Sequence, residues 1–424
     1  MRIAVVGLGQ IGLPLAVQYA SRGHEVVGCD VDAGVVEALN AGRSPHPGEA
    51  AVDEPLPGLV ATGRLRATTD DAEGVRGAEA VVVIVPVAID ADRRVDFGAI
   101  DTATRDVGRG IGPGALVVVE TTLPVGTTRG RLTPMLEAES GLRAEDDLFV
   151  AFSPERVLVG RVLEDLRRYP KVVGGIGPRS TARALDFYRA VLEEGTELRE
   201  VSGAEAAEMT KLAETTYRDV NIALANEYAR FAAERGIDVM EVIEAANSQP
   251  YSHVHRPGVG VGGHCIPVYP HFLFADAPDM RLPPAARRIN DEMAAWAVSE
   301  AQRTIGSLQD AGVLVLGIAY RGGVREDAFS SAYALRDALA AVGARVHGHD
   351  PFLSAAELME RGFSPWRPGD ATPIRFAVLQ ADHAEYRTLD LASIPGLQLL
   401  LDGRNALDPP AVRAAGIAYL GIGR

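Results

Sequence analysis

Cysteine is scarce in this sequence, with two residues among 424. Two cysteines without paired spacing exclude a disulfide framework and a cysteine-based zinc cluster, and they fit a reducing compartment. No run of about 18 apolar residues suggests a membrane span. The N-terminal apolar stretch is broken by glycines and Pro14, so it is a poor signal peptide. We therefore expect a cytoplasmic protein with no metal site and no membrane partner.

Positive charge is also in short supply, since 42 Lys+Arg against 57 Asp+Glu leave a net charge of −15. This balance argues against nucleic acid as a partner, and an anionic small substrate would have to meet a local basic cluster. The apolar content of 47% is ordinary for a globular protein, and the length predicts two or three domains.

The N-terminus combines a strand, a glycine turn, a helix and a second strand that ends in an acid. Residues 2–6 predict a buried strand, and the turn Gly7-x-Gly9-x-x-Gly12 follows at once. Asp30 ends the second strand, 18 positions after Gly12 (30 − 12). Together these features predict a dinucleotide site, with the pyrophosphate at the helix N-terminus and Asp30 on the adenosine ribose. A carboxylate at that place repels a 2′-phosphate, which favours NAD over NADP.

Further buried strands are predicted over 115–120 and 148–152. Ligands of an open parallel sheet bind beyond the carboxyl ends of its strands, where Thr122 and the pair Glu155-Arg156 follow. Thr122 either binds ligand or water, or caps the next helix. The acid and base at 155–156 are either a surface pair or site residues.

The middle of the chain changes to helical spacing, with long helices predicted over 203–234 and 284–304. The first carries Lys211, Arg218 and Asn221. Lys211 and Arg218 are about two turns apart and share a face, which is either solvated surface or the lining of a cleft for an anion. Long apolar-faced helices between domains also pair across two-fold axes, so we expect a homodimer.

The last third repeats the plan of strand, helix and strand ending in an acid, over 312–320, 331–342 and 344–350, without the full glycine fingerprint. It is a second nucleotide-binding half or a purely structural α/β domain. The expected fold is α/β, with two Rossmann-like parallel-sheet domains joined by a central helical region. The expected boundaries are 1–200, 201–305 and 306–424.

A glycine-rich loop over 257–270 carries Cys265. Glycines let a ligand approach the backbone closely, and prolines stiffen the loop. Cys265 is either a small core residue or a reactive thiol. Cys29 lies inside the second strand, where a packed thiol is expected.

In its order of motifs the chain resembles the UDP-glucose/GDP-mannose dehydrogenase family, over essentially its whole length. The motifs are the N-terminal fingerprint, Glu-Thr-Thr-Leu-Pro-Val-Gly-Thr-Thr at 120–128, the Lys211 helix, and Gly-Gly-His-Cys-Ile-Pro at 262–267. The last is most similar to the branch that oxidises UDP-N-acetylhexosamines.

The resemblance implies a four-electron oxidation of a sugar C6 alcohol to a carboxylate with two NAD. Cys265 would add to the intermediate aldehyde as a thiohemiacetal and then carry a thioester. Lys211 matches the family's lysine, which stabilises the oxyanion. Glu155 matches an acid that moves a proton or directs water, and Thr122 matches a threonine near water and cofactor.

The resemblance, together with the basic and polar side chains near its motifs, also gives two sets of binding residues. The expected cofactor positions are Gly7, Gly9, Gln10, Ile11, Gly12, Asp30 and Thr122. The expected substrate positions are Arg156, Val157, Lys211, Arg218, Asn221, Arg256, Gly262, Tyr320, Arg321 and Arg404.

Five positions depart from the family pattern: Thr215, Tyr269, Gln249, Tyr251 and Val87. Thr215 and Tyr269 stand where the family usually has asparagine and aspartate. Both usual residues help to position water. A second hypothesis is therefore a protein that binds NAD and a nucleotide sugar with impaired turnover. A third is a two-electron hydroxyacid dehydrogenase that uses Lys211 alone. The sugar stays open between a UDP-N-acetylhexosamine and UDP-glucose.

Overall fold

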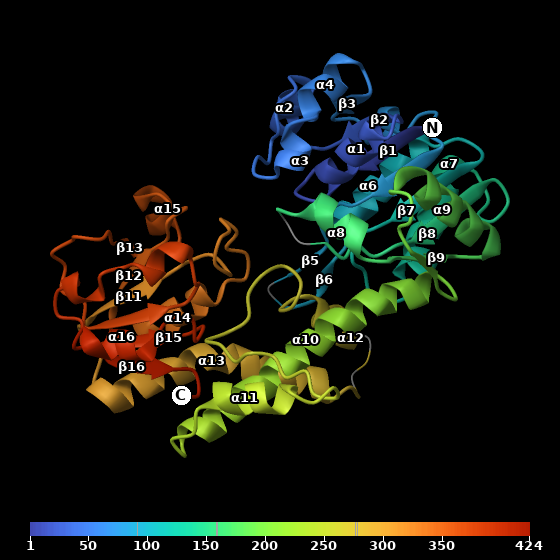
Figure 1. The fold of residues 1–424 in the computed structure, drawn as a ribbon. Coiled ribbons are helices and arrows are strands. Elements are labelled where there is room, and N and C mark those ends of the chain that lie inside the picture. The colour runs from blue at the N-terminus through green and yellow to red at the C-terminus, as the bar shows by residue number, and fades with distance from the viewer. Residues whose placement is uncertain (91, 158–159, 276, 278) are drawn as a thin grey trace. The chain divides into compact units, whose positions relative to one another are not determined.

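The computed structural model describes residues 1–90, 92–157, 160–275, 277 and 279–424. The chain divides into two compact units (Figure 1). The first comprises Met1–Glu214 and His271–Asp276, and the second comprises Thr215–Pro270 and Ala277–Arg424. We treat each unit by itself.

The first unit is built on an eight-stranded sheet with the spatial order β10-β9-β8-β7-β4-β1-β2-β3. The central strands are valine-rich and buried along their whole length, which is typical of a parallel sheet covered by helices on both faces. From β3 to β8 the order is that of the doubly wound dinucleotide-binding sheet, whose ligand crevice forms where the order reverses, here between β1 and β4. The strands are β1 (Arg2–Val6), β2 (Glu25–Cys29), β3 (Leu65–Thr68), β4 (Ala80–Val83), β7 (Ala115–Val119), β8 (Leu148–Phe152), β9 (Lys171–Gly175) and β10 (Leu198–Glu200).

Helices and one short hairpin surround this sheet (Figure 1). They are α1 (Gly12–Ser21), α2 (Ala33–Asn40), α3 (Ala50–Asp53), α4 (Leu56–Ala61), α5 (Asp71–Gly74), the hairpin β5 (Ala88–Ile89) with β6 (Val95–Asp96), α6 (Gly98–Gly110), the π-helical turn η1 (Thr128–Leu132), α7 (Thr133–Ser140), α8 (Val162–Arg168) and α9 (Pro178–Val191).

One neighbouring pair of the sheet, β8 with β9, is antiparallel, with Ala151 opposite Gly175 and Phe152 opposite Gly174. A strand that runs the other way brings its amino end to the edge where its neighbours finish. Lys171, the first residue of β9, therefore lies at the edge where β7 and β8 end.

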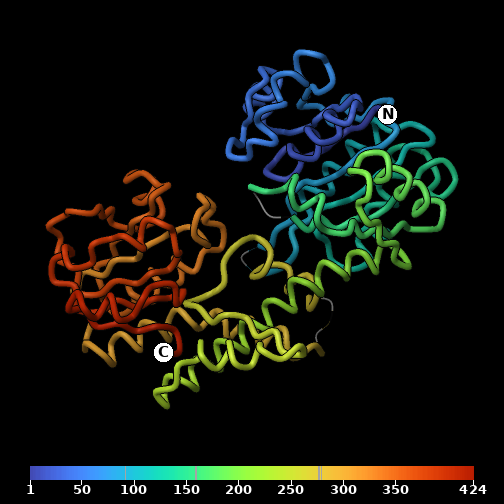
Figure 2. Tube along the Cα trace, in the orientation of Figure 1, coloured from blue at the N-terminus to red at the C-terminus, as the bar shows by residue number. Residues whose placement is uncertain are grey.

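The central region is helical, and its described residues between β10 and β11 form no strand. The predicted long helices are present as α10 (Ala204–Ala233) and α13 (Leu282–Ile305), within two residues of the expected bounds. Shorter helices are α11 (Val239–Asn247) and α12 (Tyr269–Phe274). Figure 2 traces α10 as one continuous helix that begins in the first unit and continues in the second.

The second unit contains a six-stranded parallel sheet with the order β13-β12-β11-β14-β15-β16, which repeats the doubly wound order of the first. Apolar side chains on both faces of this sheet form its core. The elements are β11 (Gly312–Leu316), α14 (Ser331–Ala341), β12 (Arg345–His349), α15 (Ala355–Glu360), β13 (Ser364–Pro365), β14 (Phe376–Leu379), the 3₁₀ turns η2 (Ala384–Arg387) and η3 (Leu391–Ser393), β15 (Leu399–Asp402), α16 (Pro409–Ala414) and β16 (Ala418–Gly421). The expected α/β class with two Rossmann-like sheets is confirmed.

Candidate active site

The glycine turn after β1 is tightly packed at its two ends and open in its middle. A Cβ on Gly7 would lie 2.7 Å from the Ile84 carbonyl oxygen, and one on Gly12 would lie 1.9 Å from the Gly7 carbonyl oxygen. A Cβ on Gly9 would meet nothing within 4 Å. The first turn of α1 has no side-chain cap, although the Leu13 N–H donates to the Gly9 carbonyl at 3.1 Å. The partial positive charge at the helix N-terminus still favours an anion there. This cradle fits the pyrophosphate of a dinucleotide.

Asp30 stands directly after β2 and closes the same turn. Its Oδ2 accepts the Leu8 N–H at 2.8 Å, and its Oδ1 accepts the Asp32 N–H at 2.9 Å. The carboxylate remains half-exposed, so it can also accept ribose hydroxyls. Gln10 is exposed and Ile11 is half-buried in the adjoining turn. The structure thus brings the predicted cofactor positions of this turn together.

Thr122 is buried two residues beyond Glu120, in the loop that follows β7. The preceding Thr121 hydroxyl donates to the Val85 carbonyl at 2.7 Å, which ties this loop to the one after β4. Both loops leave the sheet at its carboxyl edge. Thr122 is therefore at the edge where its expected role near the cofactor requires it.

Lys211 reaches that edge from the first-unit part of α10. Its Nζ donates to the backbone carbonyl of Glu155 at 2.6 Å. Nearly one turn earlier, the buried carboxylate of Glu208 accepts the N–H groups of Gly126 and Thr128 at 2.5 and 2.8 Å. These bonds fasten α10 to the loop after β7 and hold Lys211 beside Glu155.

Arg156 and Val157 follow Glu155 at the same edge. The Arg156 guanidinium pairs with Glu214 at 2.5 Å and donates to the Pro170 carbonyl at 3.1 Å. Val157 packs against the core of the first unit. The first unit thus gathers the predicted set of Thr122, Glu155, Arg156, Val157 and Lys211.

In the second unit the cysteine loop packs on the segment after β11. The Gly263 N–H donates to the Ala328 carbonyl at 2.9 Å. A Cβ on Gly262 would lie 2.8 Å from Tyr320 Cβ, and one on Gly263 would lie 3.1 Å from the Tyr320 ring. Gly263 also has a φ of +93°, which L side chains rarely adopt. This close approach explains the glycine content of the loop.

The two thiols lie in different surroundings, as expected. Cys265 is half-buried in its loop, whereas Cys29 is fully buried in β2. Burial raises the pKa of the Cys29 thiol, with Asp71 adding to the effect. Cys29 is therefore a packed thiol, and Cys265 is the candidate nucleophile.

His264 lies 3.6 Å from Glu326, measured from Nε2 to Oε1. The interaction with Glu326 raises the pKa of His264, and the same interaction lowers the pKa of Glu326. Glu326 also accepts the Ala328 N–H at 2.9 Å. The residue before Cys265 is therefore anchored to the same segment as the glycines.

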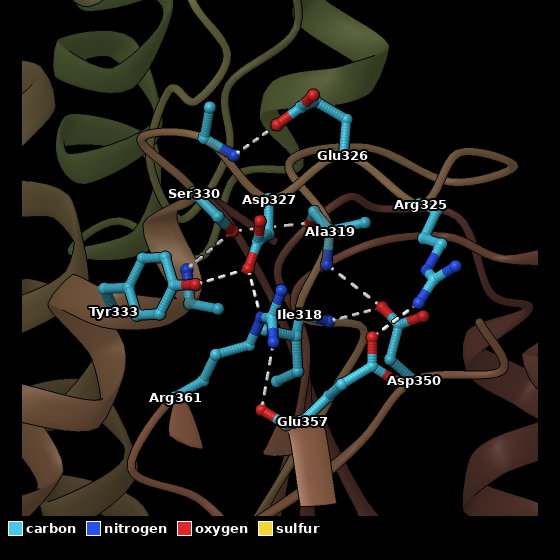
Figure 3. A network of polar contacts seen from close by, with 12 residues as sticks. Ile318, Ala319, Arg325, Glu326, Asp327, Ser330, Tyr333, Asp350, Glu357 and Arg361 are labelled. Carbon is cyan, nitrogen blue, oxygen red and sulfur yellow. Dashed lines mark hydrogen bonds and ion pairs between the residues drawn. The ribbon is translucent and has the colours of Figure 1, made fainter. Parts of the chain in front are cut away.

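The segment from 320 to 330 is held in turn by ion pairs and hydrogen bonds on its other side. Asp327 accepts the Tyr333 hydroxyl and pairs with Arg361, and Arg325 pairs with Glu357 (Figure 3). These contacts link the segment to α14 and to the end of α15, so the surface against which the cysteine loop packs is well braced.

Two predicted substrate residues, Tyr320 and Arg321, belong to this segment, and a third, Arg404, contacts it. Arg321 Nε donates to the Tyr320 hydroxyl at 3.1 Å. Arg404 donates to the backbone carbonyls of Tyr320, at 3.0 Å, and Gln380. Burial lowers the pKa of Arg404. The second unit thus gathers Gly262, Cys265, Tyr320, Arg321 and Arg404.

Asn221 holds the chain that leads into the cysteine loop. Its Nδ2 donates to the His253 carbonyl at 2.7 Å, and its Oδ1 accepts the His255 N–H at 2.8 Å. Arg218 is exposed on the same helix, and Arg256 lines a cavity of about 1030 Å³. Their expected contacts with substrate stay predictions.

Asp350 repeats the position of Asp30 but not its exposure. It accepts the N–H groups of Ile318 and Ala319 at 2.8 and 3.0 Å (Figure 3). His383 Nε2 lies 3.2 Å from the same carboxylate, and both side chains are fully buried. Asp30 in the first unit can therefore accept hydrogen bonds from a ribose, whereas Asp350 in the second unit is used up in buried contacts within the protein.

Among the described residues, no group of three or more His, Cys, Asp or Glu side chains could hold a metal ion. In the same part of the chain, no helix combines the length and apolar character needed to cross a membrane.

Comparison with known families decides the assignment. Residues 1–192 match the NAD binding domain of the UDP-glucose/GDP-mannose dehydrogenase family, residues 205–292 its central domain, and residues 314–409 its UDP binding domain. The chain belongs to this family. It is an NAD-dependent nucleotide-sugar dehydrogenase, and the predicted resemblance, enzyme class and cofactor are confirmed.

Similar proteins match the chain over its whole length. UDP-N-acetyl-D-mannosamine dehydrogenase of Pyrococcus horikoshii is 36% identical over 100% of this chain and 99% of that protein. A solved structure of a UDP-D-ManNAc dehydrogenase from Pyrococcus horikoshii has a TM-score of 0.89 at 34% identity, over 100% of this chain and 99% of that one. A UDP-glucose dehydrogenase structure from Pyrobaculum islandicum has a TM-score of 0.86 at 28% identity, over 100% and 97%.

Sequence reasoning missed several residues that hold parts of this dehydrogenase site. Lys171 pairs with Glu120 and Glu155, and Asn226 accepts the Gly258 N–H. Glu208 holds the loop after β7, and Glu326 holds His264. One signal for Lys171 was present in the composition. Lysine occurs at only two positions of the sequence, 171 and 211.

Proposed function

We propose that this dehydrogenase oxidises the C6 alcohol of a UDP-N-acetylhexosamine to the uronic acid, with UDP-glucose as the second candidate sugar. The match to the UDP binding domain supports the nucleotide. The relative named for UDP-N-acetyl-D-mannosamine supports the sugar class. The motif at 262–267 supports the same branch.

Cys265 is the nucleophile of the proposed reaction. NAD supplies the hydride acceptor, and two molecules take up the four electrons of the conversion. After the alcohol has become an aldehyde, the thiolate adds to its carbonyl carbon and forms a thiohemiacetal. Loss of the second hydride leaves a thioester, and water then cleaves the C–S bond to give the carboxylate and the free thiolate.

The first-unit residues carry the charge and the protons of these steps. The Lys211 ammonium, held at the Glu155 carbonyl, stabilises the oxyanion. Glu155 moves the proton or directs the water, and Thr122 acts near the water and the cofactor. In the second unit the proposed substrate positions are Arg218, Asn221, Arg256, Gly262, Tyr320, Arg321 and Arg404. In the first unit they are Arg156, Val157 and Lys211.

The packing of the cysteine loop on the segment after β11 carries this proposal. Residues 262 and 263 lie against Tyr320 without room for side chains, and that segment belongs to the UDP binding domain. A nucleotide held there has its sugar near Cys265. A plain hydroxyacid dehydrogenase would need neither the loop nor this domain.

The test is incubation of the purified protein with NAD and a panel of UDP-, dTDP- and GDP-sugars. We expect two NADH per sugar and a product heavier by 14 Da, the mass difference between –CH₂OH and –COOH, with a UDP-N-acetylhexosamine as the best substrate. Mass spectrometry of the products identifies the sugar. If no sugar of the panel gives NADH, and the ligands only stabilise the protein against unfolding, the chain is instead a binding protein with impaired turnover.

We also propose a homodimer that forms through α10. Leu224, Tyr228 and Phe231 are exposed at i, i+4 and i+7 spacing, so they form one apolar stripe. Exposed Tyr217 extends it by two turns. A second copy related by a two-fold axis would cover this stripe.

Two further proposals concern organisation and compartment. We propose that the domains at 1–200, 201–305 and 306–424 serve NAD binding, dimerisation with part of the active site, and nucleotide-sugar binding. The family matches at 1–192, 205–292 and 314–409 support this division. The free cysteines support the cytoplasm.

A further inference from the structure

Both lysines of the chain touch the same residue. The sequence has 42 Lys+Arg, and all except Lys171 and Lys211 are arginine. Lys171 Nζ donates to the Glu155 carboxylate at 2.8 Å, and Lys211 Nζ donates to the Glu155 backbone carbonyl at 2.6 Å. An ammonium is a compact charge, whereas a guanidinium is a broad planar fork. All remaining Lys/Arg positions of the chain are arginine. The two positions that contact Glu155 are therefore the only ones with the compact lysine ammonium.

Lys171 lies in a dry cluster that the strand order assembles. Glu120 follows β7, Glu155 lies three residues beyond β8, and antiparallel β9 presents Lys171 at the same edge. Lys171 Nζ also donates to Glu120 at 2.9 Å, and the Tyr188 hydroxyl donates to the other Glu120 oxygen at 2.6 Å. The side chains of Lys171, Glu120 and Glu155 are 6%, 0% and 10% exposed.

Solvent has little room beside this cluster. The cavity lined by Glu155 and Lys171 has a volume of about 10 Å³, which is space for one water at most. Charges in such a place interact strongly because water does not screen them.

Two carboxylates share one cation here, so a single proton decides the charge of the cluster. Burial raises the pKa of Glu120 to about 7, and Glu155 adds to this effect, although Lys171 opposes it. Burial acts in the same direction on Glu155, but the attraction of Lys171 and hydrogen bonds from Glu120 and Lys171 outweigh it and lower the pKa of Glu155. Near neutral pH, Glu155 and Lys171 are charged while Glu120 gains or loses its proton.

The cluster is mechanically joined to the site. The Glu155 carboxylate turns back to accept the Arg156 N–H at 2.7 Å, which fixes the peptide that follows it. The carbonyl of that peptide is the group that receives Lys211. A shift of the Glu155 carboxylate therefore moves the acceptor that positions the Lys211 ammonium.

We propose that Glu120 and Lys171 are positioning residues of the oxidation site, which act through Glu155 to fix its charge and the place of the Lys211 ammonium. This inference rests on the proposed function for the role of Lys211. It adds Glu120 and Lys171 to the site and gives the buried cluster a role in catalysis as well as in stability.

The chain's two lysines make the direct test possible. Protein labelled with ¹⁵N at its lysine side chains should give two ammonium signals, and a Lys171→Arg variant assigns them by removing one. We expect both wild-type signals to shift with a midpoint near pH 7 as Glu120 ionises. In Glu120→Gln this shift should disappear from both signals, because the amide keeps a hydrogen-bond acceptor but does not titrate. A Lys211 signal that is the same in both proteins at every pH would overturn the proposal.

Kinetics with the substrate found by the sugar panel supply the second measurement. Lys171→Met should lower kcat by about ten- to a hundredfold, as expected when a reacting group is misplaced, with KM for NAD within about twofold. Lys171→Arg should recover only part of the loss. If Lys171→Met does not fold, Glu120→Gln decides alone, since its kcat profile should lose the inflection near pH 7. An unchanged profile contradicts the proposal.

Glu193→Gln is the matched control. Glu193 pairs with Arg167 at 2.6 Å in the same unit, but its side chain is 45% exposed. Neither the lysine signals nor kcat should change in this variant. If the wild-type protein oxidises no nucleotide sugar, the proposed function fails, whereas the coupling between the two lysine signals is still measured.

Discussion

Asn226 of α10 and Gly258 of the cysteine loop are joined by a buried hydrogen bond, in which the Gly258 N–H donates to Asn226 Oδ1 at 2.9 Å. Asn226 Nδ2 donates to Asn290 of α13, and Asn290 donates to Asp219, which also pairs with Arg287 at 2.8 Å. A continuous polar chain between two helices therefore ends on the backbone that leads to Cys265.

Replacing Asn226 with alanine should loosen this anchor. The loss leaves the buried Gly258 N–H without its acceptor, which costs about 1–3 kcal/mol of the free energy of unfolding. We also expect faster alkylation of Cys265, because the loop is less firmly held. Asn40→Ala is the control, since Asn40 makes two similar bonds to Ala67 in the first unit. It should lower stability without changing the alkylation rate, and equal rates in all three proteins would argue against the anchor.

Alkylation should separate the two cysteines. Iodoacetamide at neutral pH should modify Cys265, whereas Cys29 is fully buried and its thiol pKa is raised by burial. Peptide mass spectrometry locates the label. Cys265→Ser should abolish complete oxidation while NAD still binds, and Cys29→Ala should keep turnover. Two NADH per sugar from Cys265→Ser would refute the thioester route.

Asp30→Asn should weaken the preference for NAD. The amide still accepts a hydrogen bond from the turn, but it removes the charge that repels a 2′-phosphate. The ratio of kcat/KM for NAD over NADP should fall by about tenfold or more, which corresponds to about 1.4 kcal/mol. Asp32→Asn is the control, because Asp32 caps α2 and asparagine caps helices equally well. An unchanged ratio in Asp30→Asn would mean that other groups select the cofactor.

Asp71→Asn should stabilise the protein above pH 6. Burial raises the pKa of Asp71 to about 6, with Asp30 and Asp70 adding to it, and its Oδ1 has no hydrogen-bond partner. A raised carboxyl pKa means that the folded state holds a proton that the unfolded state releases. The protonated Asp71 carboxyl therefore contributes fully to the stability of the folded state below the unfolded pKa of about 4. This contribution is lost as the pH rises through about 6.

The expected gain from Asp71→Asn is about 1–2 kcal/mol at pH 8 and none at pH 3.5, measured by denaturant unfolding. Asp390→Asn is the control, because Asp390 is exposed, caps η3 in the second unit and is not among the charges that raise the pKa of Asp71. A gain of equal size at both pH values would show that ionisation is not the cause.

Phe231→Glu should break the proposed dimer. A carboxylate placed in the proposed apolar interface loses its water on association, which is costly. Light scattering should show a lower mass for the variant at the same concentration. Met359→Glu is the matched control, since Met359 is 61% exposed on α15. A wild-type monomer would exclude the interface outright.

The sequence by itself determined the architecture of this dehydrogenase. Valine-rich runs predicted the buried strands, helical spacing predicted α10 and α13, and Gly7, Gly9 and Gly12 predicted the cofactor turn. Such features are local, because period, backbone freedom and burial of one segment are written in consecutive residues. The motif around Cys265 is also a run of consecutive residues, and it could be recognised from the sequence alone.

Only the tertiary structure decided which polar side chains share a site. Lys171 contacts Glu120 and Glu155 because β9 runs antiparallel to β8. The residue pattern of β9 does not predict whether it runs parallel or antiparallel to its neighbour. Asp350 ends its strand as Asp30 does, yet it is buried against His383, so equal sequence positions acquired different tasks. Burial and pairing depend on residues far apart in the chain, and these set the charge and orientation of each group.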